Sequence, residues 1–208
     1  MKKIVGILDL GISNISSVNN AIEYLGAKTT FIKNSKDLKK ITHLIIPGTG
    51  SYDSFKKKLI KKKFFEDLIK YIKFDKKPIL GICLGMQILG SSSEEGQENG
   101  IGIFDYKIKK LISSKIKENM RIPNIGFRRI FNFKKEKLFL NINENDAFYF
   151  LHSYAVYKIN NNKINYAIAH HSKNFIAAFC HENIYCVQFH PEKSQISGIK
   201  IFKNFLSL

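Results

Sequence analysis

Short apolar runs alternate with amphipathic stretches through the first half of the chain. The apolar runs predict buried strands at residues 3–8, 29–32, 43–46 and 78–82. Apolar positions three or four residues apart predict helices over 15–25, 64–72 and 84–89, with a short helical turn over 35–40. Because strands and helices alternate with short connections, the sequence predicts an α/β fold with a mainly parallel sheet covered by helices on both faces.

The pattern changes after Gly102 to short segments in which apolar and polar positions alternate. These segments predict further strands at residues 104–108, 146–151, 154–159, 164–169, 175–180 and 184–189. Polar residues 160–162 and 182–183 predict hairpin turns, and residues 198–206 predict a closing helix. The second half should therefore add mixed or antiparallel strands to the parallel core. No repeat or linker divides the chain, so we expect one domain over residues 1–208.

Composition places the chain among ordinary globular proteins. Of its 208 residues, 44% are hydrophobic and 25% are charged. No apolar run is long enough to span a bilayer, and the first run is interrupted by Asp9, which argues against a signal peptide or anchor. Three cysteines are an odd and small number, which argues against a disulfide framework and for a reducing compartment. We therefore expect a cytoplasmic protein without a membrane segment.

The formal net charge of +17 raises the question of nucleic-acid binding. The lysines, however, are spread along the whole chain, and dense runs occur only at residues 56–58 and 61–63. This distribution is typical of a compositional bias on a solvated surface rather than of a phosphate-binding patch. Docking of an acidic partner and steering of a phosphorylated substrate remain open explanations for the charge.

Cys83 stands where a predicted strand ends and a predicted helix begins. Gly81 and Gly85 flank it, and neither carries a Cβ that would crowd the backbone or a bound substrate. A sulfur at such a turn faces the positive end of the helix dipole, which lowers a thiol pKa, and the thiolate is the nucleophilic form. The alternative interpretation is a small core residue, because free cysteines are among the most buried side chains.

A candidate base for this nucleophile lies near the end of the chain. An alternating strand leads to His190, and Pro191 ends the strand because it has no backbone donor. Glu192 follows two residues after the histidine, so in an extended segment both side chains point to the same side. A histidine so placed can take the thiol proton while the carboxylate orients the imidazole. Together, Cys83, His190 and Glu192 form a candidate catalytic triad.

These two motifs, Gly81–Gln87 and Gln188–Ser194, resemble those of the class I glutamine amidotransferases, and the resemblance extends from Asp9 to the final helix. Within that class the chain is most similar to the glutaminase subunits of imidazole glycerol phosphate synthase. The resemblance implies a flavodoxin-like α/β fold and hydrolysis of glutamine without a cofactor. It also implies a heterodimer in which a (β/α)8-barrel synthase subunit receives the ammonia for histidine biosynthesis.

The resemblance further implies roles for residues outside the triad. Backbone N–H groups of Thr49 and Leu84 would form the oxyanion hole, although a plain tight turn is the alternative for the loop at residues 47–50. The implied substrate-binding residues are Gln87, Glu94, Ser153 and Tyr154. For Glu94, a solvated loop acid is an equally good interpretation. Asn14 and Lys193 are the implied contacts with the synthase partner.

Other chemistry is less well supported by the sequence. Apart from His190 and from His152, which precedes Ser153, four histidines lack a spaced acidic or cysteine partner, so no metal site is indicated. They are His43, His170, His171 and His181. The chain departs from the family at Leu10, at Ser13 and over residues 124–128, which leaves the ammonia acceptor open. A paralogous glutaminase that supplies ammonia for amidination of a sugar is one alternative. A cysteine peptidase or γ-glutamyl hydrolase of similar fold is another, and a non-catalytic binding subunit is a third.

Overall fold

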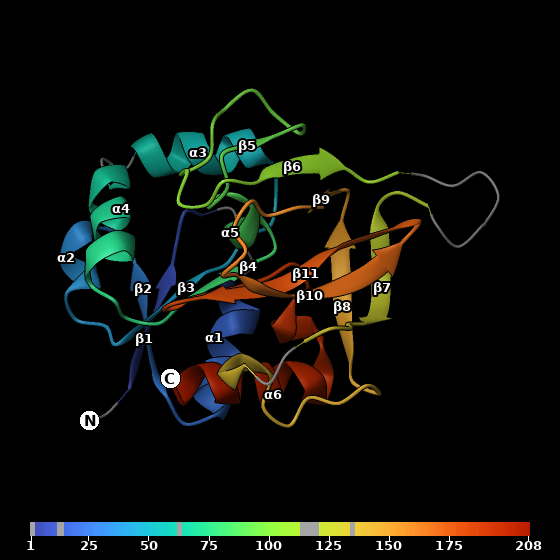
Figure 1. Ribbon diagram of the computed structural model, residues 1–208. Coiled ribbons are helices and arrows are strands. Elements are labelled where there is room, and N and C mark those ends of the chain that lie inside the picture. Colours follow the sequence, from blue (N-terminus) through green and yellow to red (C-terminus); the bar gives the residue numbers. More distant parts are fainter. Residues whose placement is uncertain (1–2, 12–14, 62–63, 113–120, 134–135) are drawn as a thin grey trace.

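The computed structural model describes residues 3–11, 15–61, 64–112, 121–133 and 136–208 (Figure 1). The helices are α1 (Ile15–Tyr24), α2 (Ser35–Leu38), α3 (Tyr52–Lys61), α4 (Phe65–Phe74), α5 (Leu84–Gln87) and α6 (Gln195–Leu206). The strands are β1 (Ile4–Leu8), β2 (Lys28–Ile32), β3 (His43–Ile46), β4 (Ile79–Ile82), β5 (Ser92–Ser93), β6 (Lys107–Lys110), β7 (Asn124–Arg129), β8 (Ala147–His152), β9 (Tyr154–Val156), β10 (Asn165–His171), β11 (Lys173–His181) and β12 (Ile184–Val187).

Within the described residues, the largest sheet has seven strands in the order β10-β11-β12-β4-β3-β1-β2. The five strands β12, β4, β3, β1 and β2 are parallel to one another, whereas β11 and β10 are antiparallel additions at one edge. The central strands β3, β4 and β12 are buried along their whole length, as expected for parallel strands that are covered on both faces. The predicted mixed, mainly parallel sheet is confirmed.

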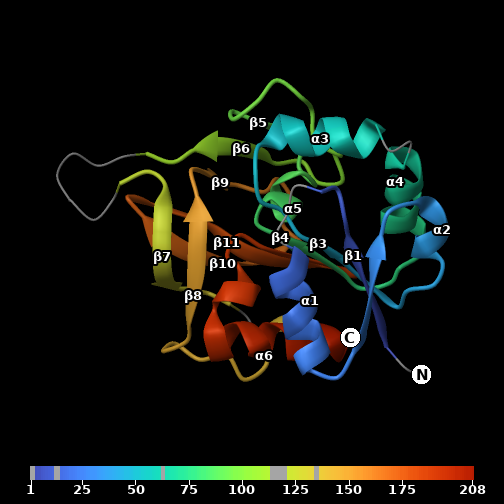
Figure 2. The same cartoon turned by 180° about the vertical axis from the view of Figure 1, so that it is seen from behind.

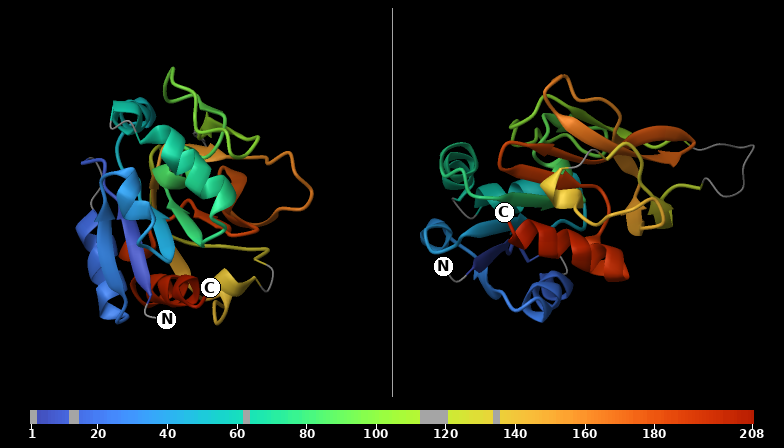
Figure 3. Two further views of the ribbon diagram at one scale, coloured as in Figure 1. Left: turned by 90° about the vertical axis from the view of Figure 1, so that its left-hand side faces the viewer. Right: turned by 60° about the horizontal axis from the view of Figure 1, so that its bottom comes forward.

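Helices cover both faces of this sheet (Figure 3). The helices α1 and α6 lie on one face, and α3 and α4 lie on the other, together with the small sheet β5-β6-β9. Val18 and Ile22 of α1 pack into the same core cluster as Phe202 of α6. Leu59 of α3 and Leu68 of α4 belong to the cluster on the opposite face. The amphipathic spacing in the sequence therefore decided which side of each helix is buried.

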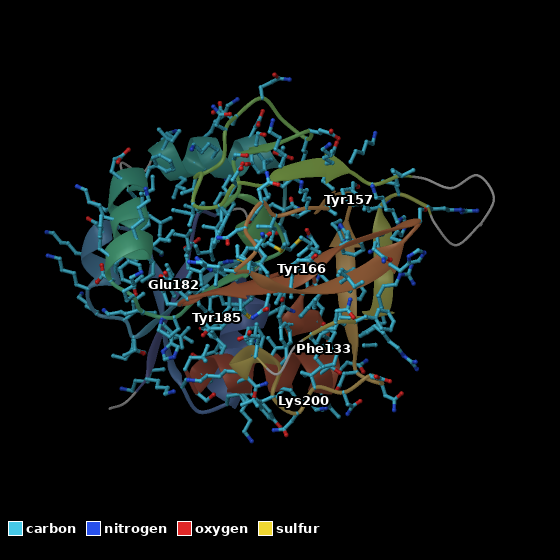
Figure 4. The ribbon with its side chains drawn as sticks, in the orientation of Figure 1. Phe133, Tyr157, Tyr166, Glu182, Tyr185 and Lys200 are labelled. Atoms are coloured by element: carbon cyan, nitrogen blue, oxygen red, sulfur yellow. The ribbon has the colours of Figure 1, made fainter. Side chains whose placement is uncertain are left out.

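A salt bridge ties α6 to the loop before β8. Lys200 projects from α6 (Figure 4), and its Nζ lies 2.9 Å from both carboxylate oxygens of Asp146. The Ser197 hydroxyl donates a further hydrogen bond to Asp146 at 2.7 Å. These contacts hold the start of β8 against the helix layer. Among the described residues, no helix is both long enough and apolar enough to cross a membrane.

Several predicted elements differ from the observed ones. Residues 182–183 form a hairpin turn between β11 and β12, as expected, but residues 160–162 do not, because β9 pairs with β6 whereas β10 pairs with β11. The predicted strand at 104–108 begins later, as β6, and α6 begins three residues before residue 198. Strand β7 was not predicted; it pairs with β8 in a separate two-stranded sheet. Alternation identifies a strand's faces but not its partner.

Helix α3 was also not predicted as a separate element. Its buried residues recur at helical spacing, as Tyr52, Phe55, Lys56 and Leu59. The lysine in this set hides the pattern in the sequence. In the structure its Nζ donates to the carbonyl oxygen of Gly100 at 2.9 Å and lies 3.9 Å from the centroid of the Phe65 ring, so the charge is partnered although the side chain is buried.

Candidate active site

The turn at Cys83 connects the end of β4 to the start of α5. Cys83 has φ 52° and ψ −108°, a conformation that non-glycine residues rarely adopt. The turn also requires close backbone packing, because a methyl group on Gly85 would lie 1.8 Å from the carbonyl oxygen of Ile46. The strained backbone carries the sulfur to the carboxyl end of the central strand. The geometry is that of a nucleophile elbow rather than of an ordinary core cysteine.

His190 and Glu192 approach this sulfur from the end of the neighbouring strand, β12. Nδ1 of His190 lies 2.7 Å from Oε1 of Glu192, and both side chains are almost fully buried. Burial by itself would lower the pKa of His190, but the Cys83 sulfur and the Glu192 carboxylate outweigh it and raise the pKa to about 10. The imidazole is therefore held protonated beside the sulfur, as an acid–base partner of a cysteine nucleophile requires.

A cavity of about 280 Å³ opens over these residues. Its walls come from segments far apart in the chain, namely the loop after β3, the elbow, the loop after β5, and the turn between β8 and β9. The lining residues are Gly48, Thr49, Gly50, Cys83, Leu84, Gln87, Glu95, Pro123, Leu151, His152, Ser153, Tyr154 and His190. The structure thus places Cys83 and His190 of the predicted triad at one pocket, with Glu192 directly behind the histidine, and it brings Thr49, Leu84, Gln87, Ser153 and Tyr154 to the same pocket; their roles remain predictions.

The two predicted oxyanion donors are not both directed at the pocket. The backbone N–H of Leu84 donates to the carbonyl oxygen of Gly48 at 3.4 Å. Gly48 approaches the elbow so closely that a methyl group there would lie 2.5 Å from the Gly85 nitrogen. As long as this contact holds, the Leu84 N–H is directed at Gly48 rather than into the pocket.

Gln87 is buried and its carboxamide is already committed to the protein. Its Nε2 donates to the carbonyl oxygen of Tyr154 and to Oε1 of Gln188, both at 3.0 Å. The Gln87 side chain therefore holds the wall formed by Ser153 and Tyr154 in place through the Tyr154 carbonyl oxygen, in addition to lining the pocket. Gln188 begins the second sequence motif and lies directly after β12, but no spacing in the sequence predicts that its amide bonds Gln87.

The structure does not bring Glu94 to the pocket. Its Oε2 accepts a hydrogen bond from the backbone N–H of Lys110 at 2.8 Å, and the residue lines a different hollow. The neighbouring Glu95 lines the pocket instead. Burial raises the pKa of Glu95, partly offset by a hydrogen bond from the backbone N–H of Tyr52. The sequence placed two adjacent acids in a polar loop, and only the register of β5 against β6 decides which one faces inward.

Of the two predicted interface residues, Asn14 lies outside the described residues. Lys193 is exposed directly after the triad, with its Nζ 5.8 Å from the centroid of the Tyr149 ring on β8. Strand β8 also approaches the site through its backbone, because the N–H of His190 donates to the Tyr149 carbonyl oxygen at 2.8 Å. Lys193 therefore lies beside the segment that carries His190 and Glu192, and it faces solvent.

Comparisons with known proteins agree with this geometry. The family described as glutamine amidotransferase class-I matches residues 6–207. The imidazole glycerol phosphate synthase subunit HisH of Leptospira interrogans is 38% identical over 98% of this chain and 100% of its own length. HisH of Leptospira borgpetersenii is 40% identical, again over 98% of this chain and 100% of its own length.

A solved structure shares the fold at lower sequence identity. The structure of PurLQS from Thermotoga maritima has a TM-score of 0.73 at 19% identity, covering 100% of this chain and 99% of its own. From its full-length match, the chain belongs to the class I glutamine amidotransferases and, within them, to the HisH family.

Proposed function

We propose that this chain is the glutaminase subunit of an imidazole glycerol phosphate synthase, which hydrolyses glutamine and passes the ammonia to a (β/α)8-barrel synthase subunit. The observation that carries the proposal is the position of Cys83, at a positive-φ elbow, beside a His190 that Glu192 holds at 2.7 Å. Full-length similarity to HisH subunits supports the histidine pathway.

The reaction follows from the chemistry of these three side chains. The Cys83 thiolate attacks the side-chain amide carbon of glutamine, and the C–N bond breaks as His190 transfers its proton to the departing ammonia. Water then attacks the glutamyl thioester, with His190 accepting a proton from it, and the C–S bond breaks to release glutamate. Glu192 keeps the imidazole oriented through both steps by its contact with Nδ1.

Three features of the pocket suit a free amino acid as the substrate. A cavity of about 280 Å³ has room for a small molecule such as a free amino acid. The Glu95 carboxylate can bind the α-amino group, and backbone N–H groups at Ser153 and Tyr154 can bind the α-carboxylate, because all three line the pocket. These assignments are part of the proposal, as is the role of Gln87 in holding the Ser153–Tyr154 segment in place.

The Leu84–Gly48 contact implies that hydrolysis by the chain alone is slow. As long as Leu84 donates to Gly48, one oxyanion donor is missing. Loss of one such donor typically costs about 100- to 1,000-fold in kcat. Partner docking that rotates the Gly48–Thr49 peptide would restore the donor, so that ammonia is released when the synthase can use it.

A docking surface for the barrel partner lies at the rim of the pocket. On one face of the β7–β8 pair, Ile125 lies opposite Leu151 and Phe127 lies opposite Tyr149. Three of them are well exposed for apolar side chains, at 52% for Ile125, 44% for Phe127 and 36% for Leu151. Leu151 also lines the pocket, so this face, with Lys193 beside it, continues the mouth of the site. Strands β7 and β8 stand together at one end of the molecule (Figure 2).

The experiment is to measure ammonia and glutamate release from glutamine by the purified chain. Activity is assayed for the chain by itself and with the histidine-pathway barrel subunit of the same organism and its nucleotide substrate. Cys83→Ala should abolish release, whereas Cys180→Ala is the matched control, because Cys180 is buried outside the pocket. We expect strong stimulation by the partner with its substrate.

Other outcomes separate the alternatives. Glutaminase activity that the partner leaves unchanged would move the acceptor to the sugar-amidination paralogue. Cleavage of peptides or γ-glutamyl chains, without ammonia release from glutamine, would indicate a peptidase or γ-glutamyl hydrolase.

We further propose that residues 1–208 act as one domain in the cytoplasm. The single large sheet with a core on each face supports one domain, and the three free cysteines support a reducing compartment.

A further inference from the structure

A continuous series of hydrogen bonds leads from β7 through the pocket wall to Cys83. It begins at Arg128, whose Nε donates to Oδ1 of Asn124 at 3.3 Å. The carboxamide nitrogen of Asn124 lies 3.0 Å from Nε2 of His152, and Nδ1 of His152 lies 2.9 Å from the carbonyl oxygen of Tyr154. Asn124 and His152 are buried, so water does not compete for these contacts.

The second half of the series continues from the same carbonyl oxygen. Gln87 donates through Nε2 to the Tyr154 carbonyl oxygen and to Oε1 of Gln188. The Nε2 of Gln188 lies 3.5 Å from Sγ of Cys83, within range of a hydrogen bond to sulfur, and Gln188 has no exposed surface. The nucleophile and the strand β7 are thus joined through buried amide side chains and a buried imidazole.

The donor and acceptor of each bond are determined by chemistry. Arg128 can only donate, so it fixes Oδ1 of Asn124 as an acceptor and directs the Asn124 NH2 group to His152. Nε2 of His152 must then accept, which leaves the proton on Nδ1 to be donated to the Tyr154 carbonyl oxygen. Burial lowers the pKa of His152 to about 4, so the imidazole is neutral and this single tautomer is required.

The orientation of Gln188 follows in the same way. Because its Oε1 accepts from Gln87, its NH2 group faces Cys83. A flipped carboxamide would set two NH2 groups against each other and would place an oxygen beside the sulfur, which a thiolate repels. The Tyr154 carbonyl oxygen is the point at which both halves meet, since it accepts from His152 and from Gln87.

We propose that Arg128, Asn124, His152, Gln87 and Gln188 form a positioning relay that holds a hydrogen-bond donor on the Cys83 thiolate and fixes the Ser153–Tyr154 wall from the inner face of β7. The inference rests on the proposed glutaminase function and adds positioning residues to that site. Asn124 and Arg128 alternate along β7 with Ile125 and Phe127, so the relay and the docking surface occupy opposite faces of one strand.

The first test is alkylation of Cys83 by iodoacetamide across pH, followed by mass spectrometry of the Cys83 peptide. Gln188→Leu should move the pH midpoint of alkylation upward by about one unit, because a hydrogen bond to a charged group is worth on the order of tenfold in an equilibrium. Gln188→Glu, which presents an oxygen in either orientation, should move it at least as far. An unchanged alkylation midpoint in a folded Gln188 variant would overturn the inner half of the relay, which runs from Gln87 through Gln188 to Cys83.

The second test uses two adjacent arginines that differ in their contacts. Arg128→Leu should raise the KM for glutamine by about threefold or more with a smaller change in kcat, and Arg128→Lys, which keeps a donor, should recover most of the loss. Arg129→Leu removes the same charge from the exposed neighbouring position and should leave KM within about 1.5-fold. Equal changes in KM at the two arginines, or no recovery of KM with lysine, would overturn the outer half of the relay, which runs from Arg128 through Asn124 to His152.

The two tests also separate this inference from the proposed function. Alkylation reports on the sulfur whether or not glutamine is a substrate. If the Gln188 variants shift the alkylation midpoint upward as expected, but the unaltered chain releases no ammonia with any partner, the proposed function fails. The part of the relay from Gln87 to Cys83 then stands. If glutamine is hydrolysed and the Gln188 variants behave like the unaltered chain, the relay fails alone.

Discussion

Exchanging each of two adjacent acids for glutamine tests how the pocket recognises its substrate. Glu95 lines the cavity over Cys83, whereas Glu94 bonds the backbone N–H of Lys110 on the other side of the small sheet. In the proposed substrate complex, Glu95→Gln would replace a charge-assisted contact with the substrate ammonium by a neutral one. Contacts of this kind are worth about 1.5–3 kcal/mol. At about 1.4 kcal/mol per factor of ten, KM for glutamine should rise about 10- to 100-fold.

Glu94→Gln is the matched control. A glutamine carbonyl oxygen can accept the same hydrogen bond from Lys110, so KM should stay within about twofold. Initial rates of glutamate formation give KM and kcat, and calorimetric titration of glutamine into the Cys83→Ala background separates binding from chemistry. A large rise in KM for Glu94→Gln together with none for Glu95→Gln would refute the assignment and restore Glu94 as the substrate ligand.

The acid limb of the pH profile provides a second test of the same residue. Because burial raises the pKa of Glu95, its carboxylate takes up a proton at a higher pH than an ordinary glutamate does. Glutamine binding by the unaltered chain should therefore weaken as the pH falls toward the acid range, and Glu95→Gln should abolish this dependence. Persistence of the full acid limb in Glu95→Gln would assign it to another group.

Three further predictions concern stability. The pKa of His190 is raised from 6.5 to about 10, so the contribution of its protonated form to the free energy of unfolding is complete below pH 6.5 and is lost as the pH rises to about 10. The urea midpoint of unfolding should therefore fall over that interval, and it should fall less in Glu192→Gln. Gly198→Ala would place a methyl group 1.8 Å from the Pro191 carbonyl oxygen and should cost about 1–3 kcal/mol by urea unfolding, whereas the exposed Ile196→Ala should change stability by less than about 0.5 kcal/mol. Asp146→Asn should cost about 1 kcal/mol at pH 7; its hydrogen bonds lower the Asp146 pKa against the effect of burial, so this difference should vanish as the pH falls below 3.8.

Much of the candidate active site could be predicted because its signals are local. Cys83 and His190 each follow a predicted strand, and each was recognised from its own motif. The parallel pairing of β12 with β4, which brings the two motifs together, is seen only in the structure. Glu192 was proposed from its two-residue spacing to His190 in an extended segment. The 2.7 Å contact is present, but Pro191–Lys193 forms a short 3-10 turn rather than the extended chain that this reasoning assumed. Each of these inferences needed only the backbone next to the residue.

Residues whose position depends on a partner strand could not be predicted in the same way. Glu95 and Glu94 exchange faces with a shift of one residue, and the pairing of β5 with β6 decides between them. Strand β7 has an interrupted apolar pattern, with Gly126 near its centre, and its strand partner is β8, which the sequence pattern does not identify. Gln188 carries no recognisable spacing, and its contact with Cys83 depends on the orientation of Gln87.

By itself, the sequence determined the α/β class, the buried faces of the main helices and the elbow with its histidine and carboxylate, because hydrophobic periodicity and strand ends act over a few residues. Only the tertiary structure decided the separate β7–β8 sheet, the acid that faces the pocket and the Leu84 N–H that donates to Gly48. Those features depend on contacts between segments distant in the chain. Their free energies come from packing and pairing that no local pattern encodes.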